Sequence, residues 1–120
     1  SGYGMDQIEF SWTDWLPWRA WRIVGTVEAA DEVPDKLPPK TAILVGTHDN
    51  PKWLAFDCPC GESHRIVVAL DPKIRPHWKV KSVQRLTLMP SIDALRNQKR
   101  CHYVISNGRI HWVRDREKKQ

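Results

Sequence analysis

The three cysteines and their spacing constrain this fold more than any other feature of the sequence. Two of them belong to the stretch 58–61 (Cys-Pro-Cys-Gly), and the third, Cys101, comes much later and directly precedes His102. Proline restricts φ and glycine permits backbone conformations that a side chain forbids, so the stretch favours a tight turn that presents two thiols. If the three thiols act together, the fold must return Cys101 to this turn.

A metal site is the chemistry that this cysteine pattern favours. An odd number of cysteines fits a disulfide framework poorly, and the N-terminus lacks a signal-peptide pattern, so we expect a cytosolic chain with reduced thiols. Cys58, Cys60 and Cys101 together with one histidine would form a tetrahedral Zn²⁺ site. Zinc cysteines are usually separated by about two to four residues, so the single residue between Cys58 and Cys60 departs from the common spacing.

Two histidines, His64 and His102, compete for the fourth ligand position. Neighbouring residues in a regular strand point to opposite faces, so Cys101 and His102 can bind one metal only if the backbone turns between them. A regular strand would leave the position to His64 and place His102 on the other face. A turn would make His102 the ligand, and we favour His102 slightly.

Three classes of function are compatible with these residues. A closed four-ligand zinc site would stabilise a binding module and perform no chemistry. An open zinc site could use Glu62 as a base on metal-bound water. A thiol or hydroxyl hydrolase could use His102 to activate Ser91 or a cysteine, with Asp115 or Asn107 orienting the imidazole. Ser91 also fits a helix N-cap, and Glu62 also fits a solvated turn.

Apolar alternation predicts an α+β domain that is mostly β, with small antiparallel sheets, the CPCG zinc knuckle and one or two short helices. One helix is expected at residues 90–95, because Ser91 follows Pro90 as an N-cap candidate. Asn107-Gly108 predicts a hairpin turn. The expected strands cover residues 21–28, 41–46, 52–56, 65–70, 77–80, 85–88, 103–105 and 109–113.

We expect one domain over residues 5–120, with residues 1–4 as a cloning remnant and residues 114–120 as a charged tail. The proline-rich stretch 31–40 predicts a surface loop. No apolar run reaches the roughly 20 residues of a membrane helix, so no membrane partner is expected.

Four of the seven tryptophans, Trp12, Trp15, Trp18 and Trp21, recur at every third position. We expect most of them to cover the core, although tryptophan is also enriched at docking surfaces. The net charge of +5 permits nucleic-acid binding, but the basic residues are scattered, so this is the least favoured function.

Three segments resemble a family of small bacterial proteins: residues 56–61, residues 86–92, which end in Pro-Ser-Ile, and residues 101–112. The resemblance covers roughly residues 53–113. Members of that family accompany bacterial ubiquitin-like conjugation genes, often in phage defence. The resemblance therefore implies a ubiquitin-like protein, or its activating or conjugating enzymes, as partners. This chain has Glu62 where the family often has a further cysteine.

The segment from His102-Tyr103 to Gly108 and Trp112 is also similar to the histidine segment of ubiquitin-specific cysteine proteases. That similarity implies His102 as general base and Asp115 as its orienting partner. The chain is far shorter than those proteases and lacks their nucleophile segment. We therefore expect a zinc-containing accessory peptidase that processes or removes a ubiquitin-like protein. The alternative is an inert zinc-stabilised adaptor that docks a pathway protein.

Overall fold

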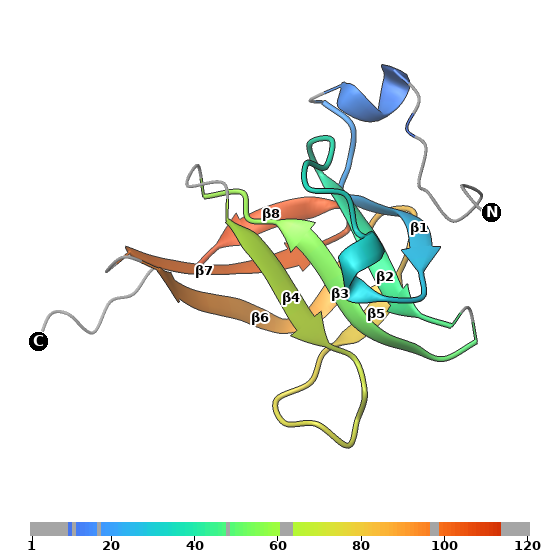
Figure 1. The fold of residues 1–120 in the computed structure, drawn as a ribbon. Helices are drawn as coiled ribbons and strands as arrows, with labels where there is room; N and C mark the ends of the chain where they lie inside the picture. Colours follow the sequence, from blue (N-terminus) through green and yellow to red (C-terminus); the bar gives the residue numbers. More distant parts are fainter. Residues whose placement is uncertain are drawn as a thin grey trace, which may run out of the picture.

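The computed structural model describes residues 10, 12–16, 18–47, 49–60, 64–96 and 99–113. Within these residues eight strands form two four-stranded sheets, with the strand orders β1-β2-β3-β4 and β5-β6-β7-β8 (Figure 1). The expectation of a mostly β fold with small sheets is thus confirmed. No helix of the described part is long and apolar enough to span a bilayer.

The first sheet consists of β1 (Arg22–Val27), β2 (Thr41–Gly46), β3 (Pro51–Asp57) and β4 (Arg65–Ala69). Strands β2, β3 and β4 pair antiparallel, whereas β1 pairs parallel with β2, which differs from the purely antiparallel sheets expected. The parallel pair arises because the chain between β1 and β2 crosses over the outer face of the sheet. There Leu37 packs with Val27, Ile43 and Val45, so β2 is covered on both faces.

The second sheet is an antiparallel meander of β5 (Lys79–Ser82), β6 (Thr87–Arg96), β7 (Lys99–Ser106) and β8 (Arg109–Trp112). The predicted Asn107-Gly108 turn joins β7 to β8, and both residues have positive φ, 53° and 76°. Asparagine and glycine tolerate this left-handed conformation better than other residues, so the hairpin prediction is confirmed.

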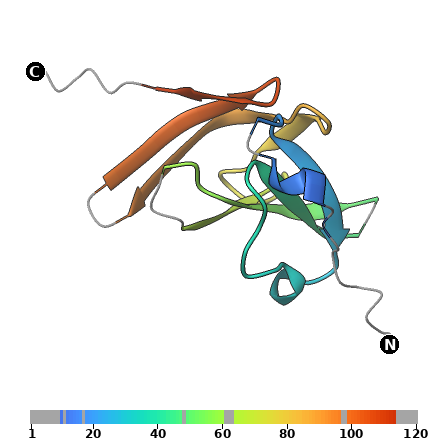
Figure 2. The ribbon, with the colours of Figure 1, turned by 90° about the horizontal axis from the view of Figure 1, so that it is seen from above.

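The inner faces of the two sheets share one core, and Figure 2 shows the sheets as two layers seen from above. Leu54, Phe56 and Val68 contribute side chains to this core from the first sheet. Ile92 and Tyr103 contribute side chains from the second sheet. Alternating apolar residues produce this core, because successive side chains of a strand point to opposite faces.

The helix predicted at residues 90–95 is wrong, because these residues belong to strand β6. They pair with β7 in the order Ile92↔Tyr103 and Asp93↔His102, and a register shift between Leu88 and Ile92 accommodates the segment around Ser91. Pairing and core burial outweigh the local helix signal, since intrinsic propensity is a weak preference. Only short 3₁₀ turns, η2 (Trp12–Trp15) and η3 (Ala30–Glu32), occur among the described residues.

The tryptophan series divides between core and surface. Trp21 is buried against Phe56, whereas Trp12, Trp15 and Trp18 are exposed, which differs from the expectation that most of the series covers the core. The segment is nevertheless attached to the domain. The buried guanidinium of Arg22 donates to the backbone and side chain of Asp14 at 3.0 and 3.3 Å.

Candidate metal centre and serine–histidine pair

Cys58, Pro59 and Cys60 directly follow β3 on the way to β4. Asp57 and Arg65 form the last pair of these strands, and the backbone N–H of Cys58 donates to the carbonyl of His64 at 2.9 Å. This hydrogen bond closes the loop and brings Cys58 and His64 together at its base. The hairpin thus supplies three candidate ligands, Cys58, Cys60 and His64, from one short stretch.

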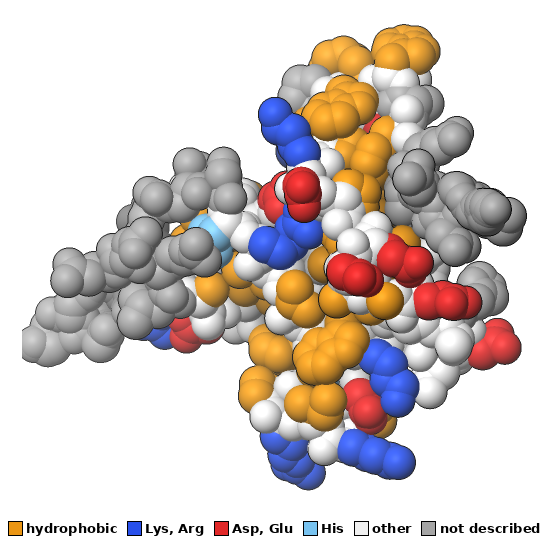
Figure 3. Space-filling view, in the orientation of Figure 1, with side chains coloured by type: hydrophobic (Ala, Val, Ile, Leu, Met, Phe, Trp, Pro, Cys, Tyr) orange, Lys and Arg blue, Asp and Glu red, His pale blue; other side chains and the backbone are white. Residues whose placement is uncertain are grey.

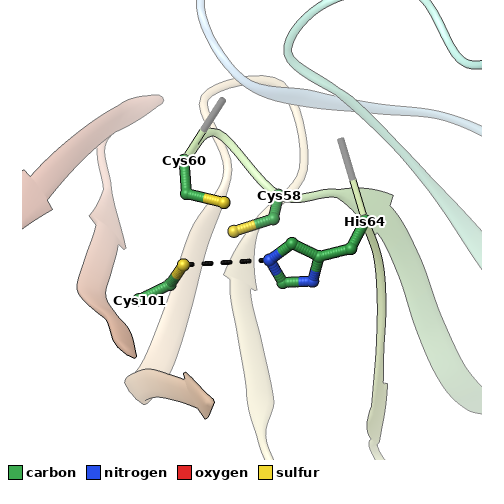
Figure 4. A group of neighbouring side chains, drawn as sticks. All are labelled: Cys58, Cys60, His64 and Cys101. Carbon is green, nitrogen blue, oxygen red and sulfur yellow. Dashed lines mark hydrogen bonds between the residues drawn. The ribbon is translucent and has the colours of Figure 1, made fainter. Parts of the chain in front are cut away.

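Strand β7 brings the fourth candidate ligand from the second sheet. The ligand atoms of Cys58, Cys60, His64 and Cys101 all lie within 4.8 Å of one another, and Cys101 Sγ is 3.8 Å from His64 Nε2 (Figure 4). Ligand atoms about 2.3 Å from a tetrahedral zinc ion would be roughly 3.8 Å apart. The donors are three sulfurs and one imidazole nitrogen, a set that suits zinc. The four residues therefore fit a bound metal ion.

In the metal-free protein, burial raises the pKa values of two of these thiols, Cys58 and Cys101. Burial, together with the adjacent thiols of Cys60 and Cys58, raises the pKa of Cys101 to about 12. Burial also raises the pKa of Cys58, although the Tyr103 hydroxyl opposes this by donating a hydrogen bond to Cys58 Sγ at 3.3 Å. Protonated thiols are poor nucleophiles, so the raised pKa values do not favour thiol catalysis in the metal-free protein.

His102 lies outside the thiol cluster, which differs from our preference for it as the fourth ligand. Strand β7 is regular here, so Cys101 points into the core with 1% exposure while His102 points to the outer face. The alternation of side chains along a strand is the physical reason. His64 takes the place beside the cysteines.

His102 instead meets Ser91. Ser91 Oγ lies 3.2 Å from His102 Nε2, and both side chains are half-buried on the outer face of the β6–β7 pair. The Ser91 carbonyl also accepts a hydrogen bond from Trp78 Nε1 at 3.2 Å, which ties the residue to the chain before β5. A serine hydroxyl within hydrogen-bond distance of an imidazole is the arrangement by which a general base activates a nucleophile.

Of the other predicted catalytic residues, the structure describes Asn107 alone. Glu62 and Asp115 lie outside the described residues. Asn107 is at the far end of β7, where its Oδ1 accepts a hydrogen bond from Arg85 Nε at 3.1 Å. An imidazole-orienting role for Asn107 therefore has no support in its contacts.

Asp93 is the acid that sequence reasoning missed. It is directly opposite His102 in the β6–β7 register, and Arg100 donates two hydrogen bonds to its carboxylate at 2.8 and 2.7 Å. These hydrogen bonds lower the pKa of Asp93, and the nearby charge of His102 lowers it further. The only sequence signal was its position two residues after Ser91, and that signal is informative only if the segment is a strand rather than a helix.

Comparison with known proteins adds one finding. A family model described as the bacterial ubiquitination-like system serine protease (BubE) matches residues 29–113, well over half of the chain. No significant match was found among curated proteins or among solved structures. The matched region contains the thiol cluster and both members of the Ser91–His102 pair.

Proposed function

The chain belongs to the BubE family of bacterial ubiquitination-like system serine proteases. From this premise we propose that it is a serine peptidase that processes a ubiquitin-like protein or removes it from a conjugate. In this proposal Ser91 is the nucleophile and His102 is the general base. The observation that carries the proposal is the 3.2 Å contact between Ser91 Oγ and His102 Nε2 on a solvent-facing part of the sheet.

The proposed reaction follows from the roles of these two atoms. Ser91 Oγ attacks the scissile carbonyl carbon while His102 Nε2 accepts the hydroxyl proton. The imidazolium then returns that proton to the leaving amine, the C–N bond breaks, and the acyl group stays on Ser91. Water releases the acyl group by the same exchange, with His102 again as the base.

Asp93 is the acid best placed to assist His102 in this proposal. Its carboxylate carries a negative charge on the strand position opposite the imidazole, which favours the imidazolium that forms during attack. Arg100 holds the carboxylate in place through its paired hydrogen bonds. Asp93 would replace Asp115 in the role that the sequence suggested.

We further propose that the four-residue cluster binds Zn²⁺ as a structural ion. Cys58, Cys60, His64 and Cys101 would complete a tetrahedral shell, and a shell closed by protein ligands has no position for substrate or water. The bound ion would supply folding energy. It would also hold β7, and with it His102, against the loop between β3 and β4.

The second candidate function is a zinc-stabilised adaptor without catalysis. It is favoured by one observation, the exposure of Trp12, Trp15 and Trp18 on an attached segment, because exposed tryptophans are frequent in docking surfaces. The adaptor would bind a protein of the ubiquitin-like pathway and leave it intact. Assay of cleavage separates this candidate from the peptidase.

The deciding experiment uses a ubiquitin-like protein of the same system, fused through its C-terminus to a reporter. The wild-type protein is expected to release the reporter, whereas Ser91→Ala and His102→Ala should each lower the rate at least about a hundredfold. Ser82→Ala is the matched control, because Ser82 is an exposed serine on β5 of the same sheet.

A fluorophosphonate probe provides a second readout that needs no substrate. It should label the wild-type and Ser82→Ala proteins but not the Ser91→Ala protein. Cleavage and labelling that persist in Ser91→Ala would disprove the assigned nucleophile. If a folded, zinc-loaded wild-type protein shows no cleavage and no labelling, the result favours the adaptor.

A further inference from the structure

A groove of about 630 Å³ lies between the Trp-rich segment, the loop before β2 and the turn between β7 and β8. Trp18 and Arg19 line one side, and Gly108 and Arg109 line another. This volume is within the range of about 300–1,000 Å³ that is typical of ligand-binding clefts. The groove is separate from the Ser91–His102 pair, since neither residue lines it.

Backbone hydrogen bonds hold the floor of this groove in a fixed shape. The N–H of Trp21 donates to the Gly108 carbonyl at 2.9 Å, and the N–H of Gly108 donates to the Leu86 carbonyl at 2.9 Å. The N–H of Leu86 in turn donates to the Trp21 carbonyl at 2.8 Å. The three bonds close a ring that joins β1, the chain before β6 and the last hairpin. The groove is therefore already formed in the free protein.

Positive charge dominates the lining. Four cations, Arg19, Lys40, Arg85 and Arg109, face one acid, Asp57. Arg19 pairs with Asp14 and Asp57 pairs with Arg65. Among the described residues, no ion pair involves Lys40, Arg85 or Arg109. Three uncompensated cations around one preformed groove make it suited to an anionic ligand.

The walls between these cations are apolar. Leu37, Pro38 and Pro39 form part of the lining, and Trp18 stands beside them with 73% of its surface exposed. Figure 3 shows hydrophobic side chains gathered over the η2 end of the molecule, with Lys and Arg side chains next to them. A peptide that carries carboxylates as well as apolar side chains matches this combination of unpaired cations and apolar walls.

We propose that this groove binds an extended, acidic segment of a protein partner. Carboxylates of the segment pair with Lys40, Arg85 and Arg109, and its apolar side chains pack on Trp18 and the proline wall. Arg109 is opposite Ser106, which is four residues from His102 on β7, or roughly 13 Å in a strand. Identifying the segment as part of the substrate rests on the proposed function, whereas the binding itself does not.

The test is fluorescence anisotropy with a labelled, short, glutamate-rich peptide, using the zinc-loaded Ser91→Ala protein so that cleavage cannot interfere. The triple variant Lys40→Gln/Arg85→Gln/Arg109→Gln should weaken binding roughly tenfold, the combined effect of three exposed ion pairs of typical strength. The matched control Lys73→Gln/Arg75→Gln/Lys79→Gln removes the same charge from exposed sites outside this groove and should keep the affinity within about twofold. Trp18→Ala should weaken binding with no change in charge.

Three outcomes would overturn the proposal: an equal loss in both triple variants, a preference for nucleic acid, and absence of peptide binding. An equal loss in the two triple variants, each shown to be folded by its thermal melt, would mean that net charge alone attracts the peptide. Tighter binding of an oligothymidylate of the same charge, lost in the groove variant, would make the groove a nucleic-acid site. Failure of peptide binding would leave the cleavage assay of wild type against Ser91→Ala unaffected, so the two proposals fail separately.

Discussion

At the scale of single residues, neighbouring positions of β7 serve two different environments. Cys101 faces the buried thiols, His102 faces Ser91, and Tyr103 faces the core again, where its hydroxyl reaches Cys58. Strand alternation alone assigns these directions. The thiol cluster and the serine–histidine pair therefore lie on opposite faces of the same stretch of β7.

Tyr103→Phe is expected to weaken metal binding about tenfold, a typical cost for removing a hydrogen-bond partner of a metal ligand. The substitution removes only the hydroxyl that donates to Cys58 Sγ and leaves the buried ring in place. Affinity is measured by competition with a chromophoric chelator.

Thr41→Val is the matched control for that substitution. It removes another buried hydroxyl, one whose hydrogen bond goes to the Pro38 carbonyl at 2.8 Å rather than to a thiol. Its metal affinity should equal that of the wild type. If the Tyr103→Phe and wild-type proteins bind the metal equally tightly, the Tyr103 hydroxyl does not affect metal binding by Cys58.

At the scale of elements, the β7–β8 hairpin depends on the glycine of its turn. Gly108 has a φ of 76°, and a Cβ at this position would lie 2.6 Å from the Cβ of Ala20. The same residue donates to Leu86 and accepts from Trp21. The turn thus fixes both the end of the second sheet and the floor of the cationic groove.

Gly108→Ala is expected to lower the free energy of unfolding by about 1–3 kcal/mol, because a side chain is strained at this φ and meets Ala20. The measurement is denaturant unfolding of the zinc-loaded protein. Asn107→Gly, which accepts the left-handed conformation readily, should have a smaller effect. An unfolding midpoint of Gly108→Ala equal to that of the wild type would contradict this account of the turn.

At the scale of the whole molecule, the thiol cluster brings together residues of both halves within the shared core, which includes Cys58 and Cys101. Three candidate ligands come from the loop between β3 and β4, and Cys101 comes from β7 (Figure 4). A bound ion would therefore oppose separation of the layers. The free energy of metal binding would then add to the free energy of folding.

Removal of zinc by a chelator is expected to lower the melting temperature and to lower peptidase activity with it, because β7 carries both Cys101 and His102. Thermal melts with and without chelator test this, and re-addition of zinc should restore the melt. Unchanged melting after complete removal of the metal would exclude a structural role for it.

Zinc affinity is expected to rise with pH between about pH 6 and pH 8. In the metal-free protein the pKa of Cys101 is about 12, so this thiol keeps its proton at neutral pH and must release it when it binds the metal. Higher pH favours that release. Competition titrations at the two pH values measure the effect, and affinity independent of pH would contradict thiolate ligation.

Sequence patterns determined most of the strands and the Asn107-Gly108 turn, because each depends on neighbours close along the chain. The residue type alone singled out the three cysteines that cluster. The tertiary structure decided what local patterns left open. Pairing with β7 turned residues 90–95 into a strand, and that strand placed Ser91 and Asp93 on the face of His102. The same regular pairing directed Cys101 inward and gave the fourth place in the cluster to His64, since long-range hydrogen bonds set which face each side chain occupies.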